Sequence, residues 1–128
     1  MEHSTTFMEI IFLIGRIILG LLLLINGVKH FLKMEKMIAY AKMKKVPMPG
    51  LAVSFTGLML LFSGVAIIGW WQITLGPALI ILAIFLFFTT MLIHAFWKAS
   101  PENRMNEVNY FMSNMMLFGA TLMMIAIT

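Results

Sequence analysis

Residues 51–70 read LAVSFTGLMLLFSGVAIIGW and contain no charged side chain. A helix that crosses the apolar interior of a bilayer needs about 20 predominantly apolar residues. Three further stretches meet this requirement, at residues 7–28, 73–93 and 108–127, and only the first of them contains charges. Because the apolar runs are continuous and do not alternate with polar residues, they indicate helices and not the strands of a membrane barrel.

The composition of the whole chain agrees with a membrane protein. Of its 128 residues, 62% are hydrophobic and 11% are charged, whereas soluble domains have about 45–50% apolar and about 25% charged residues. Too few polar side chains are present to cover a water-soluble globule, and the same composition excludes disorder. The absence of cysteine excludes disulfides, thiolate metal sites and thiol redox chemistry by this chain.

We predict an all-α fold in which a single membrane domain, residues 1–128, forms a four-transmembrane-helix bundle. The four helices are expected at about residues 7–33, 51–71, 74–97 and 101–127. A short amphipathic interfacial helix is predicted between helices 1 and 2, because apolar residues recur there at helical spacing among lysines (Met34, Met37, Ile38, Ala41). The Pro-Met-Pro-Gly sequence of residues 47–50 should end it, and Ser100 with Pro101 should start the last helix.

The basic residues predict an orientation. Six of the nine Lys and Arg residues lie between residues 29 and 45, and Lys98 and Arg104 lie in the third connection. The positive-inside rule then predicts a multi-pass plasma-membrane protein with connections 1–2 and 3–4 in the cytoplasm and both termini outside. The net charge of +4 therefore needs no nucleic-acid partner, since no groove-reading element is visible. Three tryptophans are expected as interface anchors in the aromatic belts (Trp70, Trp71, Trp97).

Small residues predict where the helices approach one another. Gly20 and Gly27 share a face of the first predicted helix, and Ser54, Gly57 and Gly64 share a face of the second. Small side chains allow helix backbones to approach closely in lipid. We interpret both stripes as packing surfaces.

Arg16 is the most informative residue of the sequence. It is expected close to the bilayer midplane, where a charge costs at least ~2.5–3.5 kcal/mol on insertion scales. Protein or ligand should therefore surround the guanidinium, which could use Glu9, backbone carbonyls or polar side chains of other spans (Asn114, Ser63, Thr89). Three roles remain open: stabilising the bundle, contacting a quinone or an anion, and contacting a partner subunit.

A second group of polar side chains gathers at the predicted inner ends of the helices. One face of the first helix carries Asn26, Lys29, His30 and Lys33. Lysine snorkelling explains this face, with ligand binding as the alternative. His94 closes the third span and is expected to face Asn109 or Asn114, either as a packing residue or as a ligand or proton relay. No zinc spacing, phosphate loop or nucleophile triad is present, so no catalytic residue and no metal site is predicted.

Short motifs over nearly the whole chain resemble one known family. They comprise GRIILG at 15–20, NGVKH at 26–30, PMP at 47–49, Gly64, Gly69, HAFW at 94–97, YFMSN at 110–114 and Gly119. In order and spacing they resemble the DoxX/DoxD family of small four-helix integral membrane proteins. The chain departs from that pattern twice: members commonly carry a glutamate near the position of Met59 or Leu60 and a lysine at that of Ser113. If this acid and base do chemistry in relatives, the present chain should not do it.

The resemblance also implies a function. Some members are associated with thiosulfate:quinone oxidoreductase or quinol oxidase, and others accompany membrane complexes that manage redox stress. We therefore expect a non-catalytic accessory or scaffold subunit of a membrane redox or respiratory complex. Its partners would be the lipid bilayer and other integral membrane subunits, or further copies of itself. No cofactor of its own is expected, beyond quinone or lipid at the bundle surface.

Two alternatives remain open. The first is a thiosulfate (sulfur):quinone oxidoreductase component that binds a quinone or an anion near Arg16, with Lys29 and His94 as further contacts. The second is a small transporter or a lipid-binding module, although four helices with one midplane charge leave little room for a polar path. For these reasons enzymatic activity is uncertain, with absence of catalysis the favoured interpretation.

Overall fold

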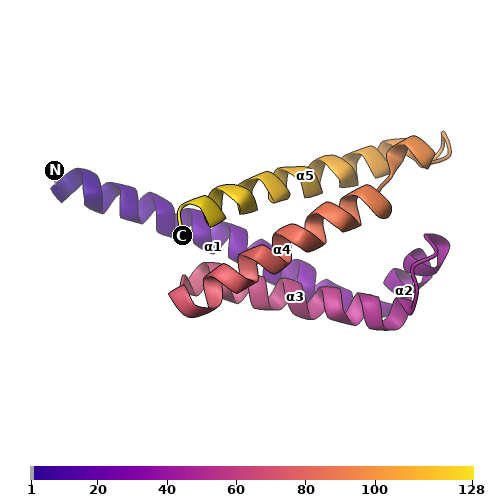
Figure 1. Ribbon diagram of the computed structural model, residues 1–128, viewed down its shortest axis with the longest axis horizontal. Helices are drawn as coiled ribbons and strands as arrows, with labels where there is room; N and C mark the ends of the chain where they lie inside the picture. Colours follow the sequence, from indigo (N-terminus) through magenta and orange to yellow (C-terminus); the bar gives the residue numbers. More distant parts are fainter. Residues whose placement is uncertain (1) are drawn as a thin grey trace. The chain divides into compact units, whose positions relative to one another are not determined.

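The computed structural model describes residues 2–128, with side chains from residue 6 onward. Its elements in chain order are α1 (Glu2–Leu32), α2 (Met34–Met43), α3 (Pro49–Gly69), α4 (Gln72–Leu92), the short 3-10 helix η1 (Phe96–Lys98) and α5 (Arg104–Ala126) (Figure 1). Four helices are long and apolar enough to cross a membrane, and the described residues form no strand. The predicted all-α fold is thus confirmed, and it fits a multi-pass membrane protein.

Three helix boundaries differ from the prediction by three residues or more. Helix α1 begins at Glu2, ahead of the apolar run that was expected to start it at residue 7. Helix α4 ends at Leu92 instead of reaching residue 97, because the chain bends at 93–95 before η1 begins. Helix α5 begins at Arg104 and not at Pro101. The Ser100 hydroxyl, which was expected to cap the helix, instead accepts a hydrogen bond from Asn103 Nδ2 at 3.2 Å, within a turn that precedes the helix.

The chain divides into two compact units, Met1–Ala78 and Leu79–Thr128, and each is described by itself. The first unit contains α1, α2, α3 and the beginning of α4. The second unit contains the rest of α4, η1 and α5. Each unit holds one group of interacting polar side chains, around Arg16 in the first and around His94 in the second.

Helices α1 and α3 of the first unit pack side by side in antiparallel directions (Figure 1). Two glycine pairs set the spacing: Gly20 faces Gly64, and Gly27 faces Gly57. A Cβ added at Gly20 would lie 2.7 Å from the Gly64 carbonyl oxygen, and one added at Gly64 would lie 2.7 Å from the Gly20 carbonyl oxygen. Since both neighbours are backbone atoms, a larger residue would force the helices apart. The predicted packing role of the glycine stripes is confirmed.

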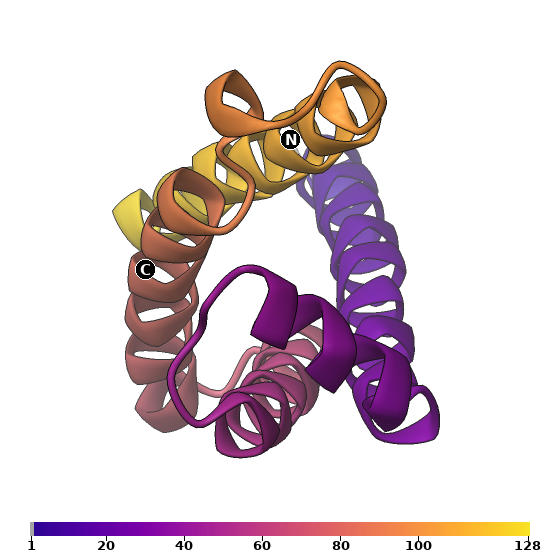
Figure 2. The same cartoon turned by 90° about the vertical axis from the view of Figure 1, so that its right-hand side faces the viewer.

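The amphipathic helix α2 follows α1 almost directly and lies against α3 (Figure 2). Its apolar side is taken up by protein: Ala41 is buried, and Met37 and Ile38 are half-buried. Met48 then adopts a left-handed backbone conformation (φ 48°) and Pro49 opens α3. The predicted turn at residues 47–50 is therefore confirmed.

Aromatic rings line the second unit along α4, η1 and α5. The Phe87 and Phe118 ring centroids are 5.8 Å apart. Near η1, Phe96 meets Phe111 edge to face at 5.1 Å, and Trp97 lies 6.0 Å from the same ring. Such pairs contribute about 0.5–1.5 kcal/mol each beyond the area they bury, so they hold η1 against α5.

Candidate functional site

The guanidinium of Arg16 binds the end of a neighbouring helix. Its Nη2 donates a hydrogen bond to the backbone carbonyl of Ile68 at 2.7 Å. Ile68 belongs to the last turn of α3, where carbonyl groups have no partner within the helix. The aligned peptide dipoles also make that end partially negative. Arg16 therefore caps α3 with a positive charge from another helix.

Two aromatic rings enclose the same guanidinium. Its Cζ lies 5.5 Å from the ring centroid of Phe12 and 5.7 Å from that of Trp70. The two rings meet edge to face, with centroids 4.8 Å apart. Phe12 precedes Arg16 by one helical turn, which places both side chains on one face of α1. The negative faces of the rings add cation–π attraction to the charge-assisted hydrogen bond.

Trp70 holds an unusual backbone conformation at this site. It caps α3 with φ 56° and ψ 38°, while its N–H donates to the Ala66 carbonyl at 2.8 Å. A bulky residue in the left-handed region is an outlier and costs on the order of 1–3 kcal/mol. Packing against Phe12 and Arg16 offsets that cost. A side chain at the preceding Gly69 would displace the ring of Trp71.

One donor of the site is not used. Arg16 as a whole is half-buried, yet its Nε is buried and has no hydrogen-bond partner. An unsatisfied buried donor costs about 1–3 kcal/mol. An acceptor oxygen supplied by another molecule would recover that energy. The arrangement thus combines a structural cap with one buried N–H group that has no acceptor among the described residues.

Arg16 stands near the middle of α1 but meets the end of its partner helix. It lies beside the last turn of α3, opposite Ile68. The reason is length: α1 has 31 residues and α3 has 21, so the beginning of α1 extends beyond the end of α3. The backbone carbonyl was among the partners expected for Arg16. Ser63, another of them, is buried in α3 with its hydroxyl unpaired.

The polar residues at the end of α1 are mostly exposed. His30 Nδ1 lies 2.8 Å from the carbonyl oxygen of Asn26, one turn earlier in the same helix. His30 is half-buried, with its Cβ close to Gly57 of α3. Asn26, Lys29 and Lys33 are exposed. This distribution agrees with lysine snorkelling.

The second unit contains a buried pair that the sequence analysis did not identify. His94 Nδ1 lies 3.0 Å from Glu107 Oε2, and the Glu107 side chain is only 5% exposed. The ring of Tyr110 lies 5.2 Å from that of His94. Asn109 and Asn114, the expected neighbours of His94, are exposed and half-buried respectively.

A signal for Glu107 was present in the sequence. An acid in the first turn of a helix is favoured by the positive end of the dipole. Glu107 was overlooked because it directly precedes the apolar run of residues 108–127 and was assigned to water.

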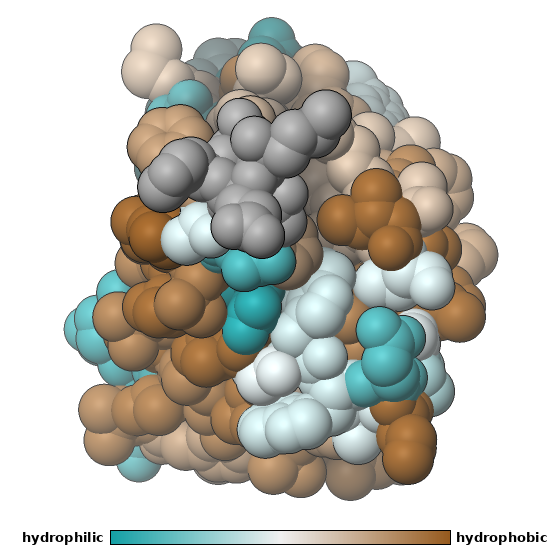
Figure 3. All heavy atoms as spheres, turned by 90° about the vertical axis from the view of Figure 1, so that its left-hand side faces the viewer, coloured by the Kyte–Doolittle hydropathy of each residue, from teal (hydrophilic) through white to brown (hydrophobic). Residues whose placement is uncertain are grey.

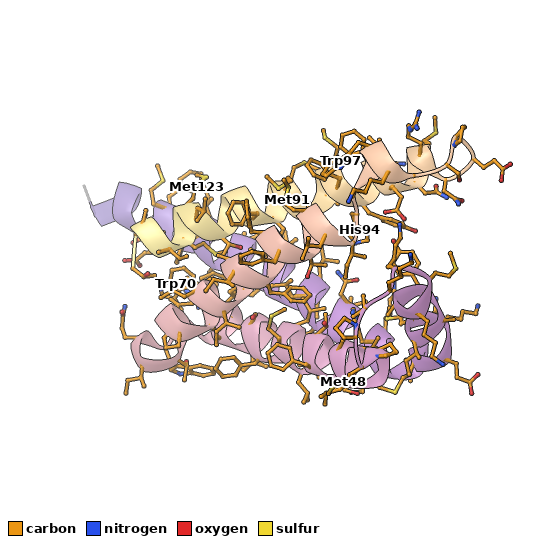
Figure 4. The ribbon with its side chains drawn as sticks, turned by 45° about the vertical axis from the view of Figure 1, so that its right-hand side comes forward. Met48, Trp70, Met91, His94, Trp97 and Met123 are labelled. Atoms are coloured by element: carbon orange, nitrogen blue, oxygen red, sulfur yellow. The ribbon has the colours of Figure 1, made fainter. Side chains whose placement is uncertain are left out.

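The tryptophans lie at helix ends. Trp70 is at the end of α3 opposite Met48, and Trp97 is in η1, just after His94 (Figure 4). Trp71 is 58% exposed and Trp97 is 49% exposed, so both can reach a membrane interface. Figure 3 shows the side of the molecule that faces left in Figure 1. Hydrophobic residues cover much of this side, and hydrophilic residues lie among them. Among the side chains of residues 6–128 no cluster of three or more His, Asp or Glu could hold a metal ion.

No family model, curated protein or solved structure matches this chain. The resemblance to the DoxX/DoxD family therefore stays a prediction that rests on the short motifs. The contacts of Arg16 and the pair His94–Glu107 are the structural features on which a function can be proposed.

Proposed function

We propose that the protein is a DoxX-like integral membrane protein that serves as a non-catalytic accessory or scaffold subunit of a membrane redox or respiratory complex. One observation carries the proposal: the guanidinium of Arg16 is engaged by its own protein, through the Ile68 carbonyl and the rings of Phe12 and Trp70. A charge used in this way stabilises the fold and has no need of a substrate. The departures from the family pattern at Met59, Leu60 and Ser113 point in the same direction.

The exposed apolar surface is consistent with a subunit. Few residues of the candidate spans Thr6–Leu32 and Arg104–Ala126 are buried, in contrast with Pro49–Gly69. In a bilayer such surface contacts lipid or the helices of other subunits. We propose that neighbouring integral membrane subunits cover part of it.

Co-purification tests this proposal. The chain, tagged at its C-terminus, is extracted from native membranes in a mild detergent, and an unrelated four-span protein with the same tag serves as the control. We expect larger integral membrane subunits in stoichiometric amount with the chain and not with the control. Isolation only as a homo-oligomer would contradict the proposal.

The proposal includes the orientation given by the basic residues. The connections α1–α3 and α4–α5 would lie in the cytoplasm of a plasma-membrane protein, and both termini outside. Because the chain has no cysteine, single substitutions Lys42→Cys and Gln72→Cys report directly on topology. A membrane-impermeant thiol reagent should label Gln72→Cys in intact cells and Lys42→Cys only after permeabilisation. The reverse pattern would contradict the orientation.

A second candidate function is supported by the unused donor of Arg16. Its buried, unpartnered Nε lies next to the rings of Phe12 and Trp70, and one N–H beside aromatic rings suits the carbonyl oxygen and flat ring of a quinone, or a small anion. The protein would then be the quinone- or anion-binding component of a thiosulfate (sulfur):quinone oxidoreductase.

Titration with a short-chain ubiquinone separates the two candidates. If the site binds quinone, tryptophan fluorescence should be quenched with saturation, the quenching should be lost in Arg16→Gln, and it should persist in the control Lys98→Gln. Quenching that is linear and identical in all three proteins would leave only the structural role of Arg16.

A further inference from the structure

Helix α2 and its two flanking turns carry an unbalanced positive charge. Between residues 29 and 45 the chain has six lysines, and Glu35 is the one acid. Four of these lysines are exposed around α2 itself: Lys33, Lys36, Lys42 and Lys45. We refer to these four side chains as the lysine collar.

The four lysines lie on or directly beside a helix that packs against α3. The apolar side of α2 packs on α3, with Ala41 buried and Ile38 Cδ1 3.8 Å from the position of a Cβ on Gly50. Lys36 and Lys42 belong to α2, whereas Lys33 is its N-cap and Lys45 follows its C-cap. All four side chains are exposed, and α2 does not have to form on binding.

The surroundings of the collar match the headgroup layer of a bilayer. Helix α2 joins the end of α1 to the start of α3, which are two candidate membrane spans (Figure 2). Met43 and Met48, next to the collar, are 72% and 65% exposed. Ammonium groups close in sequence to exposed apolar side chains, at the end of apolar helices, can meet phosphate while the methionines meet acyl chains.

We propose that the lysine collar binds the headgroups of anionic phospholipids in the leaflet on the α2 side of the membrane. The exposed methionines favour a lipid over a free phosphate ion, because a free ion makes no use of them. Lys44 is not included, since its amine lies 5.5 Å from the ring centroid of Tyr40 and contacts that ring.

The proposal predicts lipid selectivity in a reconstituted bilayer. The full chain is placed in phosphatidylcholine vesicles with a trace of spin-labelled phosphatidylglycerol or spin-labelled phosphatidylcholine. The motionally restricted fraction of each label then reports its association with the protein. We expect phosphatidylglycerol to be favoured about two- to fivefold, and the preference to shrink as NaCl is raised.

A matched pair of double variants locates the selectivity. Lys36→Gln with Lys42→Gln removes two charges from the collar, and Lys98→Gln with Arg104→Gln removes two from the α4–α5 connection. The first variant should bring the preference close to one, the second should leave it unchanged, and Lys36→Arg with Lys42→Arg should retain it. Circular dichroism of each variant confirms that α2 is still folded.

Three results would overturn the proposal. The first is a wild-type preference near one, and the second is an equal loss in both Gln variants. The third is displacement of the labelled lipid by inorganic phosphate more strongly than by chloride at equal ionic strength, which would assign the collar to a free anion.

Discussion

The two units of the chain accommodate a polar side chain among apolar helices in different ways. In the first unit, the cation of Arg16 meets a backbone carbonyl and two aromatic rings. In the second unit, the imidazole of His94 meets the carboxylate of Glu107. The first solution uses partial charges that every helix end supplies, whereas the second requires one specific partner side chain. Arg16 can therefore be stabilised without an acid, and the first unit depends on close helix packing instead.

The largest effect is expected where that packing is broken. Gly64→Val places side-chain atoms against the Gly20 backbone, and overpacking of this kind costs about 1–3 kcal/mol. It should also move Arg16 away from Ile68. The stability of the chain in mixed micelles, measured by SDS titration, should fall accordingly. Gly15→Val is the control, because nothing lies within 4 Å of a Cβ at Gly15, and an equal loss in both variants would contradict the assigned contact.

The second largest loss of stability is expected from breaking the pair His94–Glu107 in the second unit. Glu107→Ala removes a buried carboxylate that binds His94, which we expect to destabilise the protein by about 1–3 kcal/mol. A double-mutant cycle with His94→Ala measures the coupling between the two side chains. Additive losses would show that the two residues do not interact, and Glu102→Ala, in the exposed turn before α5, is the matched control.

Loss of the cap on α3 should cost less, because Arg16 is only half-buried. For Arg16→Leu we expect a loss of about 1–2 kcal/mol and a changed emission of Trp70. Arg16→Lys keeps the charge near the helix end and should recover part of the stability. If Arg16→Leu is as stable as the wild type, the cap does not contribute to stability, and the ligand-binding alternative gains support.

The smallest effect should come from the aromatic part of the site. Phe12→Leu removes the edge-to-face contact with Trp70 and one cation–π partner, together about 0.5–1.5 kcal/mol. Phe55→Leu, at an exposed position of α3, provides the comparison. An equal change in both variants would show that the contact with Trp70 adds nothing specific.

Much of the fold could be predicted from the sequence, because the length and continuity of apolar runs dictate membrane helices. The glycine faces could be predicted equally well, because small residues allow membrane helices to approach closely. They comprise Gly20, Gly27, Gly57 and Gly64. The amphipathic helix α2 was found from the spacing of its apolar residues, but its contact with α3 was not foreseen.

The contacts of the two sites were harder to predict from the sequence than the fold, for two physical reasons. The partner of Arg16 is a backbone carbonyl, which every residue carries, so residue identity gives no sign of Ile68. Which carbonyl Arg16 meets depends on the register between α1 and α3, which hydropathy does not fix. Glu107 was missed although the predicted helix at 101–127 includes it, because it precedes the apolar run and was assigned to water, so no buried partner was expected for it.

Solid-state NMR in a lipid bilayer tests the capping of α3 by Arg16 most directly. In an Arg104→Lys background Arg16 is the only arginine, so ¹⁵N-labelled guanidinium nitrogens report on it alone. A dipolar dephasing measurement to a ¹³C-labelled Ile68 carbonyl should detect the close contact that the 2.7 Å hydrogen bond requires. Absence of any dephasing between these nuclei, in folded protein, would contradict the cap and the account built on it.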